Sequence, residues 1–224
     1  MKNSIMTHVV AGYPSFDECL ELMLGMQEAG VDAIEMQIPF SDPSADGPVI
    51  MAANDISLKK GMTTDLSFEL INKARNIERE KKYQEAVKEA EVSFKHYRKD
   101  PLFIAGLMLY IGEGDNKDRA KIRIANSRTS VHRIYIDFMV AYFGIERSKI
   151  RFWVLLYPDL SEGACMKYWS KALKLPYSQF YKNQVIQGKS KKRTLQFGVG
   201  NTIIVSTVLK YKLNRWIELA EKDL

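Results

Sequence analysis

The chain has few of the features that mark secreted, membrane or disordered proteins. Only two cysteines occur in 224 residues, Cys19 and Cys165, and neither belongs to a CxxC pair. They predict buried thiols in a reducing, cytoplasmic setting, without a zinc site or a disulfide framework. The longest apolar run, Leu102–Ile111, is far shorter than the roughly 20 residues that cross a bilayer, so we expect no membrane segment. The first residues show no signal-peptide pattern.

Low-complexity tracts are also absent, and the content of 46% hydrophobic residues suits one large or two small domains. The charges, however, are unevenly distributed. Residues 1–75 hold five basic and eleven acidic residues, whereas the remainder holds 28 basic and 16 acidic ones. This asymmetry favours different partners for the two segments, with nucleic acid the leading candidate for the basic one. Ordinary lysine-rich solubility is the alternative.

The first 40 residues predict a strand, a helix and a second strand. The apolar run Ile5–Val10 ends in a turn, and Ser15 with Glu18 forms a capping box for a helix that ends at Gly30. A second apolar run, Ala33–Ile38, follows. Strand, helix and strand with short connections form a βαβ unit, which implies parallel strands.

Beyond this unit, the sequence predicts a short helix at 49–58 and a long helix from Thr63 to about Lys99, with a highly charged middle. We therefore divide the chain into an α/β segment at 1–75, a helical linker at 76–100 and an α+β domain at 101–224. Within that domain the patterns predict helices at 102–112, 130–143, 160–173 and 208–222, and strands at 121–125, 150–156, 180–186 and 195–205. Four large aromatic residues are expected to fill its core: Trp153, Tyr168, Trp169 and Trp216.

Two carboxylates stand near the end of the second predicted strand. Glu35 lies inside an apolar run. Burial of a carboxylate there costs free energy unless the group is protonated, is paired with a cation or has a catalytic role. Asp46 follows on a loop at the carboxyl side of the strand, where parallel α/β barrels place their chemistry. The pair suits general acid–base catalysis, although Asp-Gly and Ser-Asp-Pro are also common turn formers.

This segment resembles the alpha chain of tryptophan synthase, a TIM-barrel lyase. Three motifs carry the resemblance: Ala-Gly-Tyr-Pro-Ser at 11–15, Glu-Ala-Gly-Val-Asp at 28–32, and Pro-Phe-Ser-Asp-Pro-Ser-Ala-Asp-Gly-Pro at 39–48. The resemblance implies that Glu35 is the acid/base for cleavage of indole-3-glycerol phosphate, that Asp46 holds the indole N–H, and that Phe40 lines the indole pocket. It implies no cofactor, and it implies a loop that docks on the tryptophan synthase beta chain.

The resemblance covers only about residues 4–75, which supply two of the eight strands of such a barrel. In the family, glycine-rich loops late in the barrel bind the substrate phosphate, and a tyrosine from a middle strand completes the pocket. We find no matching stretch after residue 76. Because two parallel strands cannot close a barrel, we expect this partial TIM-barrel segment to be inactive as a lyase alone.

A glycine-punctuated helix opens the basic domain. Residues 102–112 include the small residues Ala105, Gly106 and Gly112, and Glu113 follows where the helix ends. Residues from about 100 to 224 resemble LAGLIDADG homing endonucleases and their noncatalytic relatives, in which two such helices pack together and their terminal acids hold divalent metal over DNA. The resemblance implies a homodimer through helix 102–112, and Mg²⁺ at Glu113 if the domain is a nuclease. The acid lies farther from Gly106 than the family's spacing has it.

The densest basic cluster lies near the last two predicted strands. It consists of Lys182, Lys189, Lys191, Lys192 and Arg193. Interleaved glutamines make the cluster suitable for binding phosphates and base edges of DNA or RNA, and a solvated hairpin tip is the alternative. Three functions therefore stay open: a lyase remnant, a nucleic-acid-binding module with or without nuclease activity, and an interaction protein that docks on the beta chain. His132, on a predicted helix, is interpreted as structural.

Overall fold

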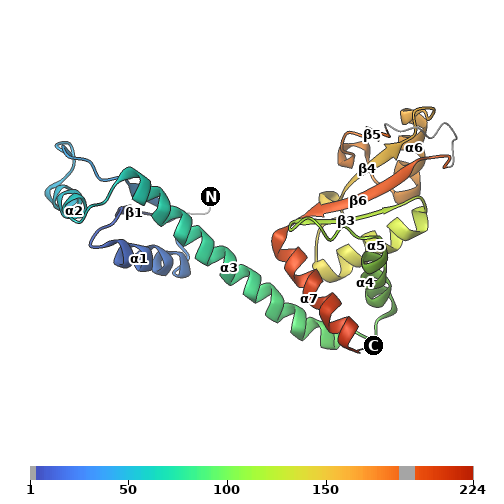
Figure 1. Ribbon diagram of the computed structural model, residues 1–224, viewed down its shortest axis with the longest axis horizontal. Coiled ribbons are helices and arrows are strands. Elements are labelled where there is room, and N and C mark those ends of the chain that lie inside the picture. Colours follow the sequence, from blue (N-terminus) through green and yellow to red (C-terminus); the bar gives the residue numbers. More distant parts are fainter. Residues whose placement is uncertain (1–3, 187–194, 224) are drawn as a thin grey trace. The chain divides into compact units, whose positions relative to one another are not determined.

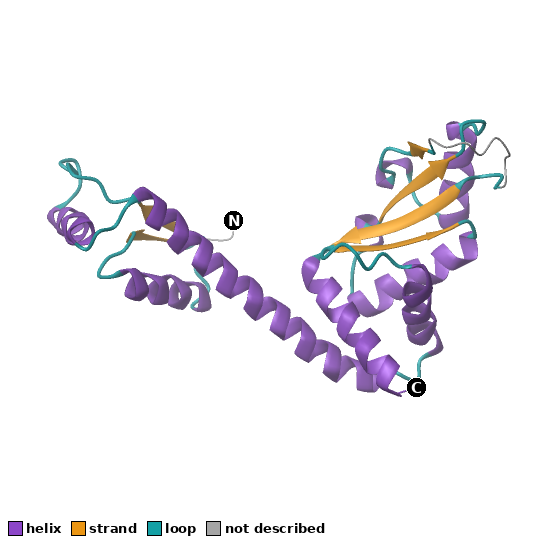
Figure 2. Ribbon diagram, viewed as in Figure 1, coloured by secondary structure: helices purple, strands orange, loops and turns teal. Residues whose placement is uncertain are grey.

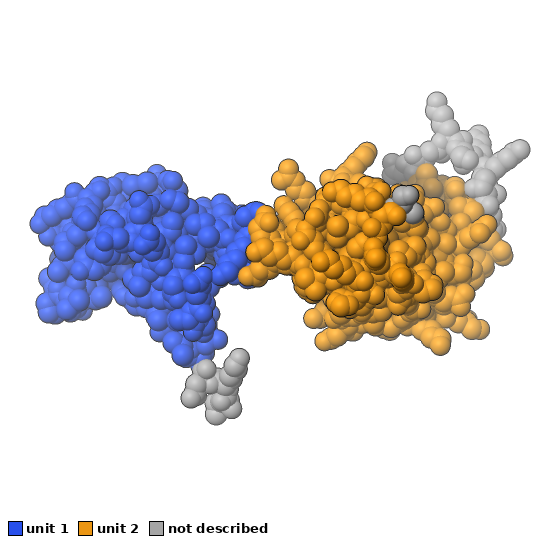
Figure 3. All heavy atoms as spheres, turned by 90° about the horizontal axis from the view of Figure 1, so that it is seen from below, with its two compact units in different colours: residues 1–82 blue, residues 83–224 orange. Residues whose placement is uncertain are grey.

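The computed structural model describes residues 4–186 and 195–223 (Figure 1). Its helices and strands fall into two compact units, residues 1–82 and 83–224 (Figures 2 and 3). We refer to these as unit 1 and unit 2, and describe each by itself. Among the residues described, no helix combines the length and apolarity needed to cross a membrane.

Unit 1 contains the predicted βαβ unit and two further helices. Ser15 caps the first helix by accepting a hydrogen bond from the Glu18 backbone N–H at 3.3 Å, and Gly30 follows that helix with a positive φ of 83°. The two strands pair in parallel. The elements are β1 (Met6–Val10), α1 (Phe16–Glu28), β2 (Ala33–Gln37), α2 (Pro48–Lys59) and the first part of α3 (Thr64–Tyr97).

Helices α1 and α3 of unit 1 cover one face of its sheet, and α2 reaches the other face at the carboxyl end of the strands, where Asn54 contacts Gln37. The buried core on the first of these faces includes Val9, Leu20 and Leu70, and the partly buried Ile34 and Met36 of β2 pack against it. Glu35, between them, points to the opposite face and is exposed. The predicted burial of Glu35 is therefore wrong. An apolar run is buried on both faces only where both are covered, and on the second face α2 covers the carboxyl end near Val10 and Gln37 but leaves Glu35 exposed.

Unit 2 is an α+β unit with a four-stranded sheet. The strand order is β3-β6-β4-β5, with β6 antiparallel to both β3 and β4, and β5 parallel to β4. The strands are β3 (Lys121–Asn126), β4 (Arg151–Leu156), β5 (Gln184–Val185) and β6 (Val199–Val205). The last two are shorter than the sequence predicts. The helices are α4 (Pro101–Glu113), α5 (Thr129–Phe143), α6 (Glu162–Leu173) and α7 (Thr207–Asp223), with 3-10 turns at Arg147–Lys149 and Tyr177–Gln179.

The helices of unit 2 lie on one side of this sheet (Figure 2). Trp169 and Trp216 are fully buried there, which confirms their predicted place in the core. Tyr168 is 36% exposed and Trp153 is only partly buried, so the same prediction is wrong for these two residues. The second half of α3 also belongs to this core through Ala90 and Phe94, and Tyr97 packs against it. The predicted linker is thus partly an element of the folded unit.

Helices α4 and α5 approach closely at Gly106. A Cβ atom added to Gly106 would lie 2.1 Å from Cγ of Phe138, so only glycine fits there. The close helix contact that the sequence predicts between two copies is therefore made within one chain at this position. The apolar side chains that α4 leaves exposed are Met108 and Ile111, at 38% and 39%.

Candidate functional site

A hydrogen-bonded network closes the carboxyl end of β2 in unit 1. The Gln37 side-chain Nε2 donates to Asp46 Oδ2 at 2.9 Å and to Asn54 Oδ1 at 3.4 Å. Its Oε1 lies 3.1 Å from His8 Nε2. Asn54, fully buried on α2, also accepts from the Phe40 backbone N–H at 3.3 Å. Gln37 and Asn54, which the sequence did not single out, therefore hold the loop that carries Asp46.

The network ties the loop that carries Asp46 to the sheet face on which Glu35 lies. Glu35 and Gln37 alternate along β2 and share the face opposite to α1 and α3, which α2 reaches at Gln37. His8 is the register partner of Glu35 across the strand pair. Phe40 lies on the loop after β2 and is 48% exposed. Water thus has free access to Glu35, and the described residues of unit 1 do not enclose a substrate.

Unit 2 presents a basic and aromatic surface on the uncovered side of its sheet. Arg123 of β3 and Arg151 of β4 are both register partners of Ile203 in the central strand β6. Trp153 is the partner of Asn201, one position further along the same face. Ile203 and Asn201 are only 6% and 3% exposed although none of the helices that the structure describes covers them. Arg123 and Arg151 thus flank Ile203, and Trp153 flanks Asn201, on this side of the sheet.

The two arginines have different partners. Arg123 forms an ion pair with Asp115 at 2.7 Å. The Arg151 guanidinium donates to the backbone carbonyls of Ser148 at 2.7 Å and Ile150 at 3.2 Å. Carbonyl contacts orient a guanidinium without neutralising it, so Arg151 keeps its charge for an anion at the sheet surface.

The predicted basic cluster is only partly described by the structure. Lys182 is exposed just before β5. Lys189, Lys191, Lys192 and Arg193 lie outside the described residues, so their role stays a prediction. Arg123, Arg151 and Trp153 were missed because their common face depends on pairing with β6, between residues that are 48 to 80 positions apart in the sequence.

Glu113 borders a hollow of about 500 Å³ at the end of α4. The other acids there are already engaged. Asp115 pairs with Arg123, and the pKa of Asp118 is held well below its usual range by hydrogen bonds from the Lys121 side chain and from the Ala120 and Lys121 backbone. Within the described part of the chain, no group of three or more His, Cys, Asp or Glu residues could hold a metal ion. The residues present do not fit a complete Mg²⁺ site.

Comparison with known proteins gives matches for unit 1. The family model of the tryptophan synthase alpha chain matches residues 1–82, where unit 1 also ends. The alpha chain of Syntrophotalea carbinolica is 52% identical over 69 residues, which are 31% of this chain and 27% of that protein. Tryptophan synthase of Saccharomyces cerevisiae is 41% identical over 75 residues, which are 34% of this chain and 11% of that protein.

A solved structure matches a third of the chain. The tryptophan synthase alpha subunit of Pyrococcus furiosus is 34% identical, with a TM-score of 0.31, over 33% of this chain and 29% of that chain. The chain therefore spans less than a third of the length of these relatives. The resemblance of residues 100–224 to LAGLIDADG proteins stays a prediction.

Proposed function

We propose that unit 1 is a tryptophan synthase alpha-type segment that keeps the acid/base pair Glu35 and Asp46 on an incomplete barrel. The observation that carries the proposal is the hydrogen bond from Gln37, which shares a sheet face with Glu35, to Asp46 on the loop at the carboxyl end of a parallel strand pair. The family match over residues 1–82 supports it. The segment is expected to be inactive as a lyase when the chain acts alone.

The proposed chemistry follows from the geometry of this face. Glu35 would exchange a proton with indole-3-glycerol phosphate. Asp46, oriented by Gln37, would accept a hydrogen bond from the indole N–H. Both steps require a pocket that excludes water and grips the substrate phosphate. Unit 1 leaves Glu35 exposed to water. Further β/α units would therefore be needed, both to enclose the substrate and to bind its phosphate. The loop at 39–48 carries the family motif. By the resemblance, this loop would dock on a beta chain.

Release of indole from indole-3-glycerol phosphate tests the proposal. The full chain should give no turnover above background, while an intact alpha chain serves as the positive control. The Glu35→Gln variant is the matched control, because it removes the proton-transfer group from an exposed position. Turnover by the full chain that Glu35→Gln abolishes would show that two strands suffice, and would overturn the proposal.

A second proposed function belongs to unit 2, namely binding of DNA or RNA on its uncovered sheet face. The carrying observation is that Arg123, Arg151 and Trp153 share that face. Unit 2 holds 25 basic and 14 acidic residues, which adds long-range attraction for a polyanion. Guanidinium groups bind phosphates, and an indole ring can stack on a base. A LAGLIDADG-like origin fits this surface, but the acids near Glu113 do not support nuclease activity.

Fluorescence anisotropy with labelled duplex DNA and single-stranded RNA tests the second function. Arg151→Ala should weaken binding several-fold and lower the salt-dependence slope by about one, because one phosphate contact is lost. Trp153→Ala should weaken single-strand binding most. Arg133→Ala, an exposed cation on α5 in the helix layer, is the matched control. Salt-independent binding, or an equal loss in the control, would argue against the sheet surface.

A further inference from the structure

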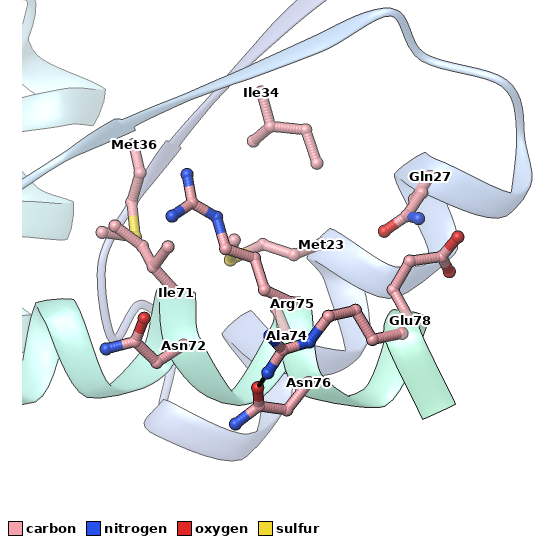
Figure 4. Close-up of a pocket in the computed structure, with 11 residues that line it drawn as sticks. Met23, Gln27, Ile34, Met36, Ile71, Asn72, Ala74, Arg75, Asn76 and Glu78 are labelled. Carbon is pink, nitrogen blue, oxygen red and sulfur yellow. Dashed lines mark hydrogen bonds between the residues drawn. The ribbon is translucent and has the colours of Figure 1, made fainter. Parts of the chain in front are cut away.

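Unit 1 contains a groove of about 660 Å³ bounded by α1, β2 and α3 (Figure 4). Its floor is apolar and consists of Met23, Ile34, Met36, Ile71 and Ala74. Met23 and Ala74 are buried members of the core, while Ile34, Met36 and Ile71 are partly exposed at the groove. The floor therefore offers apolar surface that a bound side chain could cover.

The rim of the groove is cationic. Arg75 extends from α3 toward β2 (Figure 4), and among the described residues no acidic side chain pairs with it. Arg79 hydrogen-bonds to the neutral Asn76. Glu78, the acid on this rim, is paired with Lys82 at 3.0 Å. Unit 1 as a whole holds eight basic and thirteen acidic residues, so the two arginines form a local positive site on an acidic unit.

The free edge of β2 borders the same groove. Within the described part of unit 1, β2 pairs with β1 alone. Toward β1, the Ala33 N–H donates to the Ile5 carbonyl at 3.2 Å, and the Gln37 carbonyl accepts from Ala11 at 2.9 Å. Backbone groups alternate in direction along a strand, so those of Ile34 and Met36 point to the free edge. The residues that floor the groove thus also offer unpaired backbone donors and acceptors.

We propose that this edge and groove bind an extended, acidic segment of a partner protein, which adds as a third strand beside β2. Backbone hydrogen bonds would come from Ile34 and Met36, and alternate apolar side chains of the segment would cover the groove floor. A carboxylate on the groove side would meet Arg75 and Arg79. The chemistry that the site recognises is a short β-strand with apolar residues at alternate positions and an Asp or Glu on the same face.

Charge distinguishes this occupant from a second copy of the chain. Antiparallel pairing of β2 with its own copy would bring Glu35 near Glu35 on one face and Arg75 near Arg75 on the other. Like charges facing each other across a strand pair are unfavourable. An acidic strand instead gives opposite charges at the rim and fills an edge that would otherwise be a template for aggregation.

The experiment uses the full chain and a fluorescent peptide, acetyl-Thr-Val-Thr-Val-Thr-Glu-Thr-amide. The two Val and the Glu occupy one face of the extended peptide. Saturable binding is expected by fluorescence anisotropy. Replacing the Glu with Lys, or N-methylating the amides on the edge that faces β2, should weaken binding about tenfold or more, since each removes a contact made only in the added-strand geometry.

Variants of the chain locate the site. Arg75→Gln should weaken binding of the acidic peptide about fivefold, and it should not weaken binding of the Lys peptide, because it removes a like-charge repulsion there. Lys73→Gln is the matched control, because Lys73 lies on the same helix outside the groove. Equal binding of the acidic and basic peptides, or full binding by the N-methylated peptide, would overturn the proposal. Self-association of the full chain that competes with the peptide would assign the edge to a second copy instead, and would also overturn it.

Discussion

Acidification is expected to destabilise unit 2 through His132. This histidine is buried on α5, with Nδ1 2.7 Å from Thr202 Oγ1 and Nε2 2.9 Å from the Asn126 carbonyl oxygen. A carbonyl oxygen can only accept, so Nε2 carries the proton and Nδ1 accepts from the threonine hydroxyl. The rings of Phe152 and Trp169 pack edge-on against the imidazole. Burial lowers the pKa of His132 from 6.5 to about 4, and the hydrogen bond to Asn126 partly opposes this.

The size of the effect follows from the two pKa values. In the unfolded chain, the imidazole of His132 binds a proton near pH 6.5. In the folded chain, the same imidazole stays neutral until the pH approaches its pKa of about 4. The neutral ring therefore stabilises unit 2 fully above pH 6.5, and this contribution is lost as the pH falls toward 4. The full contribution to the free energy of unfolding is ~3 kcal/mol, of which ~2 kcal/mol is lost between about pH 7 and about pH 5.

Urea unfolding followed by tryptophan fluorescence measures this loss. All three tryptophans lie in unit 2, so the signal reports that unit alone. His132→Gln should lower stability at neutral pH and flatten its pH dependence. His96→Gln, which changes an exposed histidine of the same unit, should keep the wild-type dependence. An unfolding free energy that is equal at both pH values, or a His132→Gln variant that keeps the full dependence, would refute the reasoning.

Two further predictions concern packing in each unit. Gly106→Ala should destabilise unit 2 by ~3 kcal/mol because the new methyl group would lie 2.1 Å from Phe138 Cγ, as thermal melts would show. Gly112→Ala, with no atom within 4 Å of the added Cβ, is its control and should change stability by less than ~1 kcal/mol. Asn54→Ala should destabilise unit 1 by ~1–3 kcal/mol because the Phe40 N–H loses its acceptor. Faster hydrogen exchange of that amide would be the readout, and unchanged exchange would contradict the assigned role.

Local chemistry made the order of elements in unit 1 predictable. The Ser15–Glu18 cap, the glycine at position 30 and the apolar spacing between them act within a few residues, and β1, α1 and β2 begin and end within about three residues of the predicted positions. The family motif at 39–48 was likewise visible as a continuous string. The side chains that orient its aspartate, Gln37 and Asn54, were not visible, because they meet through contacts across 9 and 17 residues.

Surface and burial depended on what each face of a sheet meets. Glu35 sits in an apolar run, and only the folded unit shows that nothing covers its side chain among the described residues. Trp153 is large and apolar, as core residues usually are. The pairing of β4 with β6 nevertheless places it on the side of the sheet that carries Arg123 and Arg151. Neither outcome follows from spacing along the chain, because a strand's pattern states which residues share a face and not what covers that face.

The sequence by itself determined the elements, the contrast between an acidic front and a basic remainder, and the alpha-chain motifs around Glu35 and Asp46. These features depend on hydrogen bonds, caps and charges close together in the chain. Tertiary structure decided which sheet faces stay open, which strand edge stays unpaired beside Arg75, and which glycine admits a neighbouring helix. Such properties arise from contacts between residues far apart in the chain, where burial depends on the partner that each surface finds.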